Sequence, residues 1–60
     1  MNVQARMNFL QNAVNEKVKV FLFNGIMLNG VLTDFDEFYI VLDNKCLVEK
    51  EKIISIVLDK

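Results

Sequence analysis

Hydrophobic residues follow two different periods along the chain. In residues 2–15 they recur every three or four positions, which is the spacing of one helix face: Val3, Met7, Leu10 and Val14. Asn2 is a suitable N-cap residue, and Asn15 stands before the charged end of this segment. We therefore expect a helix over about residues 2–15. Since so short a helix is marginal in water alone, it should pack on the sheet or on a neighbouring subunit.

From residue 17 onward the period is two, which is typical of β-strands. Five runs of this kind can be separated: residues 17–23, 26–33, 38–42, 46–48 and 53–58. Asn24-Gly25 lies between the first two runs, and this dipeptide favours a two-residue hairpin turn with positive φ at both residues. Gly30 interrupts the second run. A glycine inside a strand indicates a sharp bend or a close approach of another backbone segment.

This order of elements predicts a single domain over residues 1–60 that is mainly β, with one N-terminal helix and five strands within residues 17–59. Short connections between consecutive strands favour an antiparallel, strongly bent sheet, and thus a small barrel. The fifth run is too apolar to remain a bare sheet edge. Pairing with an edge of another subunit would cover it, and a head-to-tail contact of this kind generates a ring if the rotation closes.

Composition favours oligomerisation and a cytoplasmic location. Of the 60 residues, 53% are hydrophobic, more than a lone domain of this size can easily hide. No run approaches the ~20 apolar residues of a membrane span, and Met1–Gln4 lacks the features of a signal peptide. The single Cys46 suits a reducing compartment. The formal charge of −1 argues against a general phosphate-binding surface, so any nucleic-acid role needs local chemistry.

Candidate catalytic and metal-binding residues are few. The sequence has no histidine and one cysteine, too few ligands for a zinc site, and neither Ser55 nor Cys46 has an identifiable base partner. Asp34, Asp36 and Glu37 could suggest a metal site or an acid–base pair. Three acids in one turn are more often a solvated loop with Asx-type hydrogen bonds. We expect Asp36 to be structural, and we expect no enzyme activity, metal or cofactor.

Two segments carry a resemblance to a known family: residues 21–30, with Asn24-Gly25 and Gly30, and residues 35–42, with Phe35-Asp36 and Phe38. At this spacing the chain resembles the Hfq family of bacterial Sm-like RNA chaperones, and Ile54-Ser55 resembles the end of that family's second motif. The resemblance implies an Sm-like (SH3-like) barrel, assembled through its fourth and fifth strands into a homohexameric ring. It also implies post-transcriptional regulation, in which the ring binds single-stranded segments of small regulatory RNA and mRNA on two faces.

One of these faces, the distal face, holds A-rich RNA in the family by stacking and by backbone contacts. The positions that match this site are Phe21, Gly25, Ile26, Met27, Leu28 and Asn29. Base stacking contributes ~1–3 kcal/mol per base and needs no net positive charge. Met27 replaces a frequent lysine and Leu47 falls near a base-contacting glutamine, so phosphate and base-edge contacts should be weaker here. From the sequence alone, Phe21 is either a core residue or a base platform.

The opposite, proximal face binds uridine-rich RNA in the family, and the matching positions are Gln4, Glu37, Phe38 and Lys52. Glu37 replaces a glutamine or lysine, Lys52 replaces a histidine, and the neighbouring Glu51 replaces a lysine. A glutamate that faces phosphate is repulsive, so we expect this site to be weakened. The family's rim arginines have no counterpart in residues 12–15.

Two functions remain open. The leading hypothesis is an RNA chaperone that holds A-rich RNA on its distal face without any bond chemistry. The alternative is an Sm-fold assembly or regulatory subunit with little RNA affinity, which the acidic Glu37 and Glu51 would favour. Residues 49–52 alternate in charge. They are expected to form a solvated strand end with cross-strand charge pairing, or else to set subunit choice across the ring contact.

Overall fold

The protein, in a computed structural model, folds as one helix followed by five strands. Residues 3–59 are described, with side chains from residue 7 onward. The elements are α1 (Val3–Ala13), β1 (Lys17–Leu22), β2 (Met27–Phe35), β3 (Tyr39–Leu42), β4 (Cys46–Glu49), the 3₁₀ turn η1 (Lys50–Lys52) and β5 (Ile53–Leu58). All strand pairs are antiparallel, in the order β4-β3-β2-β1-β5. The predicted fold class is confirmed. The proposed N-cap Asn2 lies outside the described residues.

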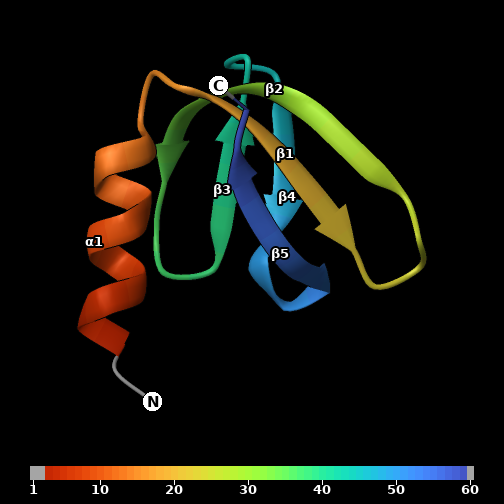
Figure 1. Ribbon diagram of the computed structural model, residues 1–60, viewed down its shortest axis with the longest axis horizontal. Coiled ribbons are helices and arrows are strands. Elements are labelled where there is room, and N and C mark those ends of the chain that lie inside the picture. Colours follow the sequence, from red (N-terminus) through yellow and green to blue (C-terminus); the bar gives the residue numbers. More distant parts are fainter. Residues whose placement is uncertain (1–2, 60) are drawn as a thin grey trace.

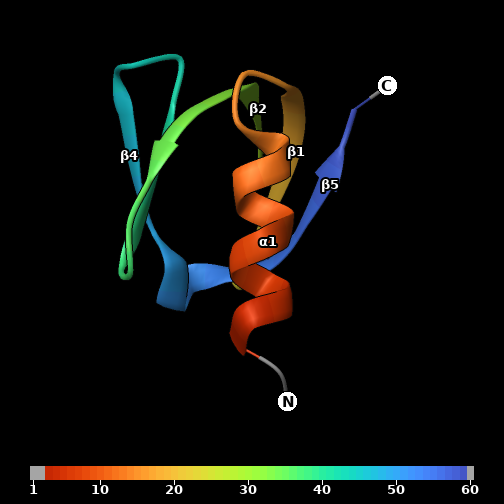
Figure 2. The ribbon, with the colours of Figure 1, turned by 90° about the vertical axis from the view of Figure 1, so that its left-hand side faces the viewer.

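The long strand β2 bends the sheet into a barrel. Its first part, residues 27–31, pairs with β1, and its second part pairs with β3 from Leu32 to Phe35. The register shifts between Leu32 and Asp34, as expected where a bulge increases the local bend. Figure 1 shows β2 arching over the other strands, and Figure 2 shows the two layers that it joins. A single strand therefore belongs to both walls of the barrel.

Helix α1 lies across the open side of the barrel (Figure 2). Leu10 and Ala13 are buried, as the helical periodicity predicts for Leu10. Asn15 takes the left-handed conformation at φ 73°, a geometry that commonly ends helices. Its N–H donates to the carbonyl of Leu32 at 2.7 Å, and the N–H of Leu32 donates to the carbonyl of Glu16 at 3.0 Å. These bonds fix the helix exit against β2.

The core is small and entirely apolar. Its members come from the helix and from four of the strands: Leu10, Ala13, Val18, Val20, Leu32, Ile40, Leu42 and Val48. β5 contributes half-buried Ile53 and Ile56 to its margin. Several large apolar side chains in the described part remain exposed instead.

Gly30 makes room for the turn between β3 and β4. Asp43 and Asn44 both have positive φ, 55° and 57°, and the N–H of Lys45 donates to the carbonyl of Leu42 at 3.0 Å. This is the geometry that a type I′ turn requires. The Asp43 carboxylate folds back onto β2, where its Oδ1 accepts from the N–H of Val31 at 3.0 Å. A Cβ at residue 30 would lie 2.8 Å from Oδ2 of Asp43. Gly30 is therefore approached closely, but by the side chain of Asp43 and not by another backbone segment as expected.

Residues 49–52 differ from the expected strand end. After Glu49 the chain forms η1, because it must cross from β4 at one edge of the sheet to β5 at the other. No ion pair involves these four residues within the part of the chain that the structure describes. Instead, the ammonium of Lys50 lies 5.5 Å from the ring centre of Phe35, and that of Lys52 lies 5.3 Å from the ring centre of Phe23. The expected cross-strand charge pairing is wrong.

The length and hydrophobicity of the helix decide whether it could cross a membrane. Within residues 3–59, no helix is long and apolar enough to span a bilayer.

Candidate nucleic-acid interface

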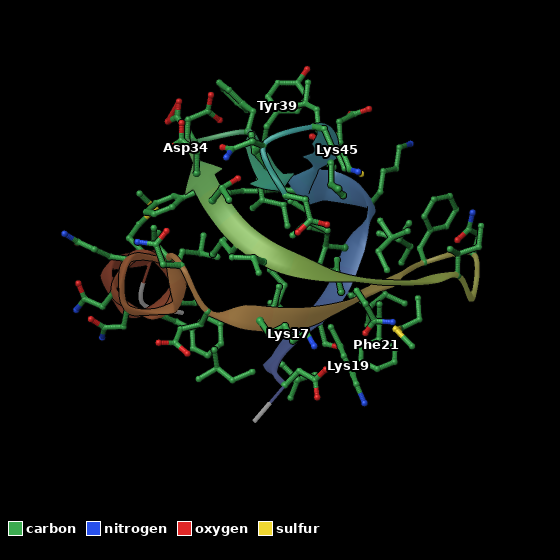
Figure 3. The ribbon with its side chains drawn as sticks, turned by 90° about the horizontal axis from the view of Figure 1, so that it is seen from above. Lys17, Lys19, Phe21, Asp34, Tyr39 and Lys45 are labelled. Carbon is green, nitrogen blue, oxygen red and sulfur yellow. The ribbon has the colours of Figure 1, made fainter. Side chains whose placement is uncertain are left out.

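Alternate residues of β1 face in opposite directions. Val18 and Val20 are fully buried, whereas Lys17, Lys19 and Phe21 point away from the core along one side of the strand (Figure 3). We call the outward surface of β1 and its two neighbours the outer face. Its members on β1, β2 and β5 are Lys17, Lys19, Phe21, Met27, Asn29, Ser55 and Val57.

Strand register places these residues in rows. Phe21 stands opposite Met27 on β2 and Ser55 on β5, while Lys19 stands opposite Asn29 and Val57. Directly opposed residues share a face, so each row joins side chains from three strands. Phe21 is 37% exposed and Met27 is 42% exposed. The outer face therefore carries an apolar row beside a row that contains a cation.

The hairpin loop between β1 and β2 extends the apolar row. The N–H of Gly25 donates to the carbonyl of Leu22 at 3.0 Å, and the N–H of Leu22 donates to the carbonyl of Ile26 at 2.8 Å. The loop thus has three residues, Phe23 to Gly25, and Gly25 alone among them has positive φ, at 87°. The predicted two-residue turn with positive φ at both residues is wrong. In a three-residue loop the left-handed position falls on the last residue, which is the glycine here.

Asn24 has a structural role in this loop. Its Oδ1 accepts from the N–H of Ile26 at 3.2 Å, the two-residue reach of an Asx-turn. Ile26 itself is 50% exposed at the foot of β2, and Phe23 is 63% exposed. The loop and the residue after it therefore expose apolar side chains at the end of β1, in a backbone held by three hydrogen bonds of 2.8, 3.0 and 3.2 Å.

The structure brings most of the predicted distal residues together. Phe21, Met27 and Asn29 lie on the outer face, Gly25 lies in the adjoining loop, and Ile26 follows that loop directly. The remaining residue, Leu28, pairs with the buried Val20 and packs against the core. Its side chain supports the outer face from beneath. Local alternation could not indicate the members on β5, Ser55 and Val57, because they join this surface only through the pairing of β5 with β1.

The predicted proximal residues are less well gathered. An open hollow of 590 Å³ lies between α1 and β5, lined by Met7, Phe9, Leu10, Glu37, Lys50, Glu51 and residues 53–56. Neither Phe38 nor Lys52 is among its described lining residues. Phe38 is 65% exposed, and Lys52 extends over the Phe23 ring. The side chain of Gln4 lies outside the described residues. Two acidic residues and one lysine thus line a hollow whose other described lining residues, apart from Ser55, are apolar.

Asp36 holds the connection between β2 and β3. Its Oδ1 accepts from the N–H groups of Phe38 and Tyr39, both at 2.8 Å, and its own N–H donates to the carbonyl of Tyr39 at 2.9 Å. The amides of Phe38 and Tyr39, and to a lesser degree the charge of Lys50, lower the pKa of Asp36 below its ordinary 3.8. This is the Asx-type bonding expected of a turn. Among the described residues, no group of three or more acids, cysteines or histidines is arranged to hold a metal.

These features define the chain as a small helix-capped barrel with an exposed aromatic and apolar outer face. The profile of the Hfq protein family matches residues 5–60. The chain belongs to the Hfq family.

Individual relatives agree with this assignment. The chain is 47% identical over 38 residues to the RNA-binding protein Hfq of Clostridium perfringens (strain SM101 / Type A), a match that covers 60% of this chain and 48% of that protein. The chain thus spans about half the length of this curated relative. It is also similar to a crystal structure of the pleiotropic translational regulator Hfq, with a TM-score of 0.86 and 23% identity. That match covers 98% of this chain and 97% of the other, and it shows the shared fold.

Proposed function

We propose that this protein is an RNA-binding chaperone that acts after transcription. It holds single-stranded, A-rich RNA on its outer face, which corresponds to the distal face of the family. Membership of the Hfq family supports RNA binding as the general activity. The observation that carries the site is the pair of exposed apolar side chains Phe21 and Met27, which stand opposite each other on the outer face, with the exposed Ile26 directly before Met27 in the chain.

The chemistry of this pair suits base stacking. Phe21 alternates on β1 with the fully buried Val18 and Val20, so its flat ring is held at the surface of a strand that is anchored in the core. Stacking of a base on an aromatic contributes ~1–3 kcal/mol and needs no net positive charge. A protein with a formal charge of −1 can therefore bind RNA here. The ring would act passively, raising the local concentration of RNA segments for pairing, and no bond is made or broken.

The same proposal includes a homohexameric ring. β4 and β5 are the two edges of the sheet, and both expose apolar side chains: Leu47 is 65% exposed, Ile54 70% and Leu58 36%. Unpaired apolar edges favour pairing with another chain. Contact between β4 of one copy and β5 of the next would be head-to-tail, and such contacts form a ring when the rotation between copies closes. The free thiol of Cys46 suits the reducing cytoplasm, where we place this ring.

A second candidate function is an assembly or regulatory subunit with little RNA affinity. The observation in its favour is the hollow beside α1, where Glu37 and Glu51 line the surface that corresponds to the family's proximal site. Carboxylates repel phosphate, and a ring repeats the repulsion in every copy. We therefore propose that uridine-rich RNA binds weakly on this face. The two candidates differ in whether the outer face binds RNA.

The test compares A-rich and uridine-rich oligonucleotides by fluorescence anisotropy at low salt, on a sample whose mass is known from light scattering. The A-rich RNA should bind more tightly. Phe21→Leu keeps an apolar side chain but removes the ring, so loss of one stacked base should weaken binding roughly 5- to 150-fold. Phe38→Leu is the matched control, because Phe38 is an exposed phenylalanine outside the outer face. It should leave A-rich binding unchanged.

Two results would contradict the proposal. An intact ring that binds no A-rich RNA at low salt would favour the second candidate. Equal losses from Phe21→Leu and Phe38→Leu would show that the RNA does not select the outer face.

A further inference from the structure

Two lysines share the outer face with Phe21. Lys17, Lys19 and Phe21 are alternate residues of β1, so their side chains leave the strand on one side at intervals of roughly 6.6–6.8 Å. Figure 3 shows the three in a line along β1, with Lys45 on the opposite side of the barrel. Along β1, Lys19 lies between Phe21 and Lys17, so Lys17 is the farther lysine from the aromatic ring. The aromatic platform thus lies at one end of a short row of cations.

Other charges on this face are few. The partners of these residues on β2 are Val31, Asn29 and Met27, and none of them is charged. On β5, Ser55 and Val57 are uncharged as well. The nearby carboxylate belongs to Asp59, which follows β5 and whose N–H donates to the carbonyl of Lys17 at 2.8 Å. This bond holds Asp59 beside β1.

Asp59 engages one of the two lysines. The Nζ of Lys19 lies 4.0 Å from Oδ1 of Asp59, with side chains 43% and 35% exposed. A pair at this separation and exposure is worth only ~0–1 kcal/mol. A phosphate can therefore replace Asp59 as the partner of Lys19 at small cost. Within the described residues, Lys17 makes no ion pair closer than 4 Å.

We propose that Lys17 and Lys19 form a phosphate-binding row for single-stranded RNA on the outer face, and that Asp59 competes with the RNA for Lys19. This inference rests on the proposed function and extends it. The sugar-phosphate backbone follows β1 along the two ammonium groups, while a base stacks on Phe21. The two lysines supply positive charge to this face, where Met27 stands in place of a lysine that is frequent in the family. Asp59 limits the affinity for RNA, because it neutralises Lys19 in the free protein.

The experiment measures binding of a short A-rich oligonucleotide over a range of salt concentrations for Lys17→Gln, Lys19→Gln and Asp59→Asn. Each lysine variant should weaken binding up to about fivefold at low salt. Each should also reduce the slope of log K against log salt by roughly 0.7, the value for one phosphate contact on a single strand. Asp59→Asn should tighten binding, and this gain should vanish in the Lys19→Gln background. Lys45→Gln is the matched control and should change neither quantity.

The outcomes separate this inference from the proposed function. If the wild type binds A-rich RNA but the lysine variants keep its affinity and salt slope, the phosphate row is wrong and the proposed function stands. Equal effects of Lys45→Gln and Lys19→Gln would show general charge attraction and would also overturn the row. Unchanged binding by Asp59→Asn would refute the competition. If the wild-type ring binds no RNA at low salt, both proposals fail together.

Discussion

The packing of Gly30 against Asp43 predicts that Gly30→Ala destabilises the wild-type protein but stabilises a variant that lacks the Asp43 side chain. In Gly30→Ala, the added Cβ would lie 2.8 Å from Oδ2 and 3.2 Å from Cγ of Asp43. The carboxylate would have to move and give up its bond from the N–H of Val31, now 3.0 Å long. A hydrogen bond of this kind contributes about 0.5–1.5 kcal/mol, and an off-rotamer side chain costs about 0.5–1.5 kcal/mol.

The opposing effect is smaller. Residue 30 does not have positive φ, so alanine is compatible with the backbone there, and Gly→Ala stabilises such positions by about 0.4–1 kcal/mol. The net expectation for Gly30→Ala is a destabilisation of about 1 kcal/mol. In the Asp43→Gly background the obstacle is gone, and glycine suits the φ of 55° at that residue. There, Gly30→Ala should stabilise the protein by about 0.4–1 kcal/mol.

Urea unfolding of the four proteins in this cycle tests the reasoning. Protomer concentration must be equal throughout, because assembly contributes to apparent stability. Asp43→Asn supplies a control background, since asparagine keeps the size of the side chain and tolerates positive φ. Gly30→Ala should remain destabilising there. A loss of the same size in the wild-type, Asp43→Asn and Asp43→Gly backgrounds would refute the proposed contact.

Two further predictions concern the core and the β2–β3 turn. Ile40→Val should lower the free energy of unfolding by about 0.5–1.5 kcal/mol in urea titrations, because Ile40 is fully buried; a neutral result would contradict that burial. Asp36→Ala should destabilise the protein in a pH-dependent way, because the amides of Phe38 and Tyr39 lower the pKa of Asp36 in the folded state. Since a lowered folded-state pKa stabilises the protein above the unfolded-state pKa, the deficit of the variant should be fully present above about pH 5. It should shrink as the pH falls through the folded-state pKa, and unfolding midpoints that differ equally at all pH values would refute this role.

The order of elements could be predicted from the sequence because each depends on neighbours a few residues apart. The period of two in β1 separates the buried Val18 and Val20 from the outward Lys19 and Phe21, and the structure has this arrangement. The position of the loop after β1 could be predicted from the sequence, but its length and backbone conformation could not. Asn24-Gly25 is compatible with turns of two or three residues, and the register of β1 on β2 selects the longer one.

The candidate site could be predicted only in part. The residues of β1, β2 and their loop are close in sequence, so a family motif and strand alternation suffice to gather them. Ser55, Val57 and Asp59 reach the same face through the β1–β5 pairing, which joins segments more than thirty residues apart. Lys52 was matched to the proximal site by its position in the sequence, but η1 turns its side chain toward Phe23.

The sequence by itself therefore determined the helix, the five strands and the alternation of side chains along β1, because these follow from periods of two and 3.6 residues. Only the tertiary structure decided that Phe21 is exposed and not part of the core, how β2 serves both walls of the barrel, and why residue 30 is glycine. The reason is physical: the obstacle at Gly30 is the carboxylate of Asp43, and a turn between β3 and β4 brings that group back onto β2. No local pattern contains a contact of this kind.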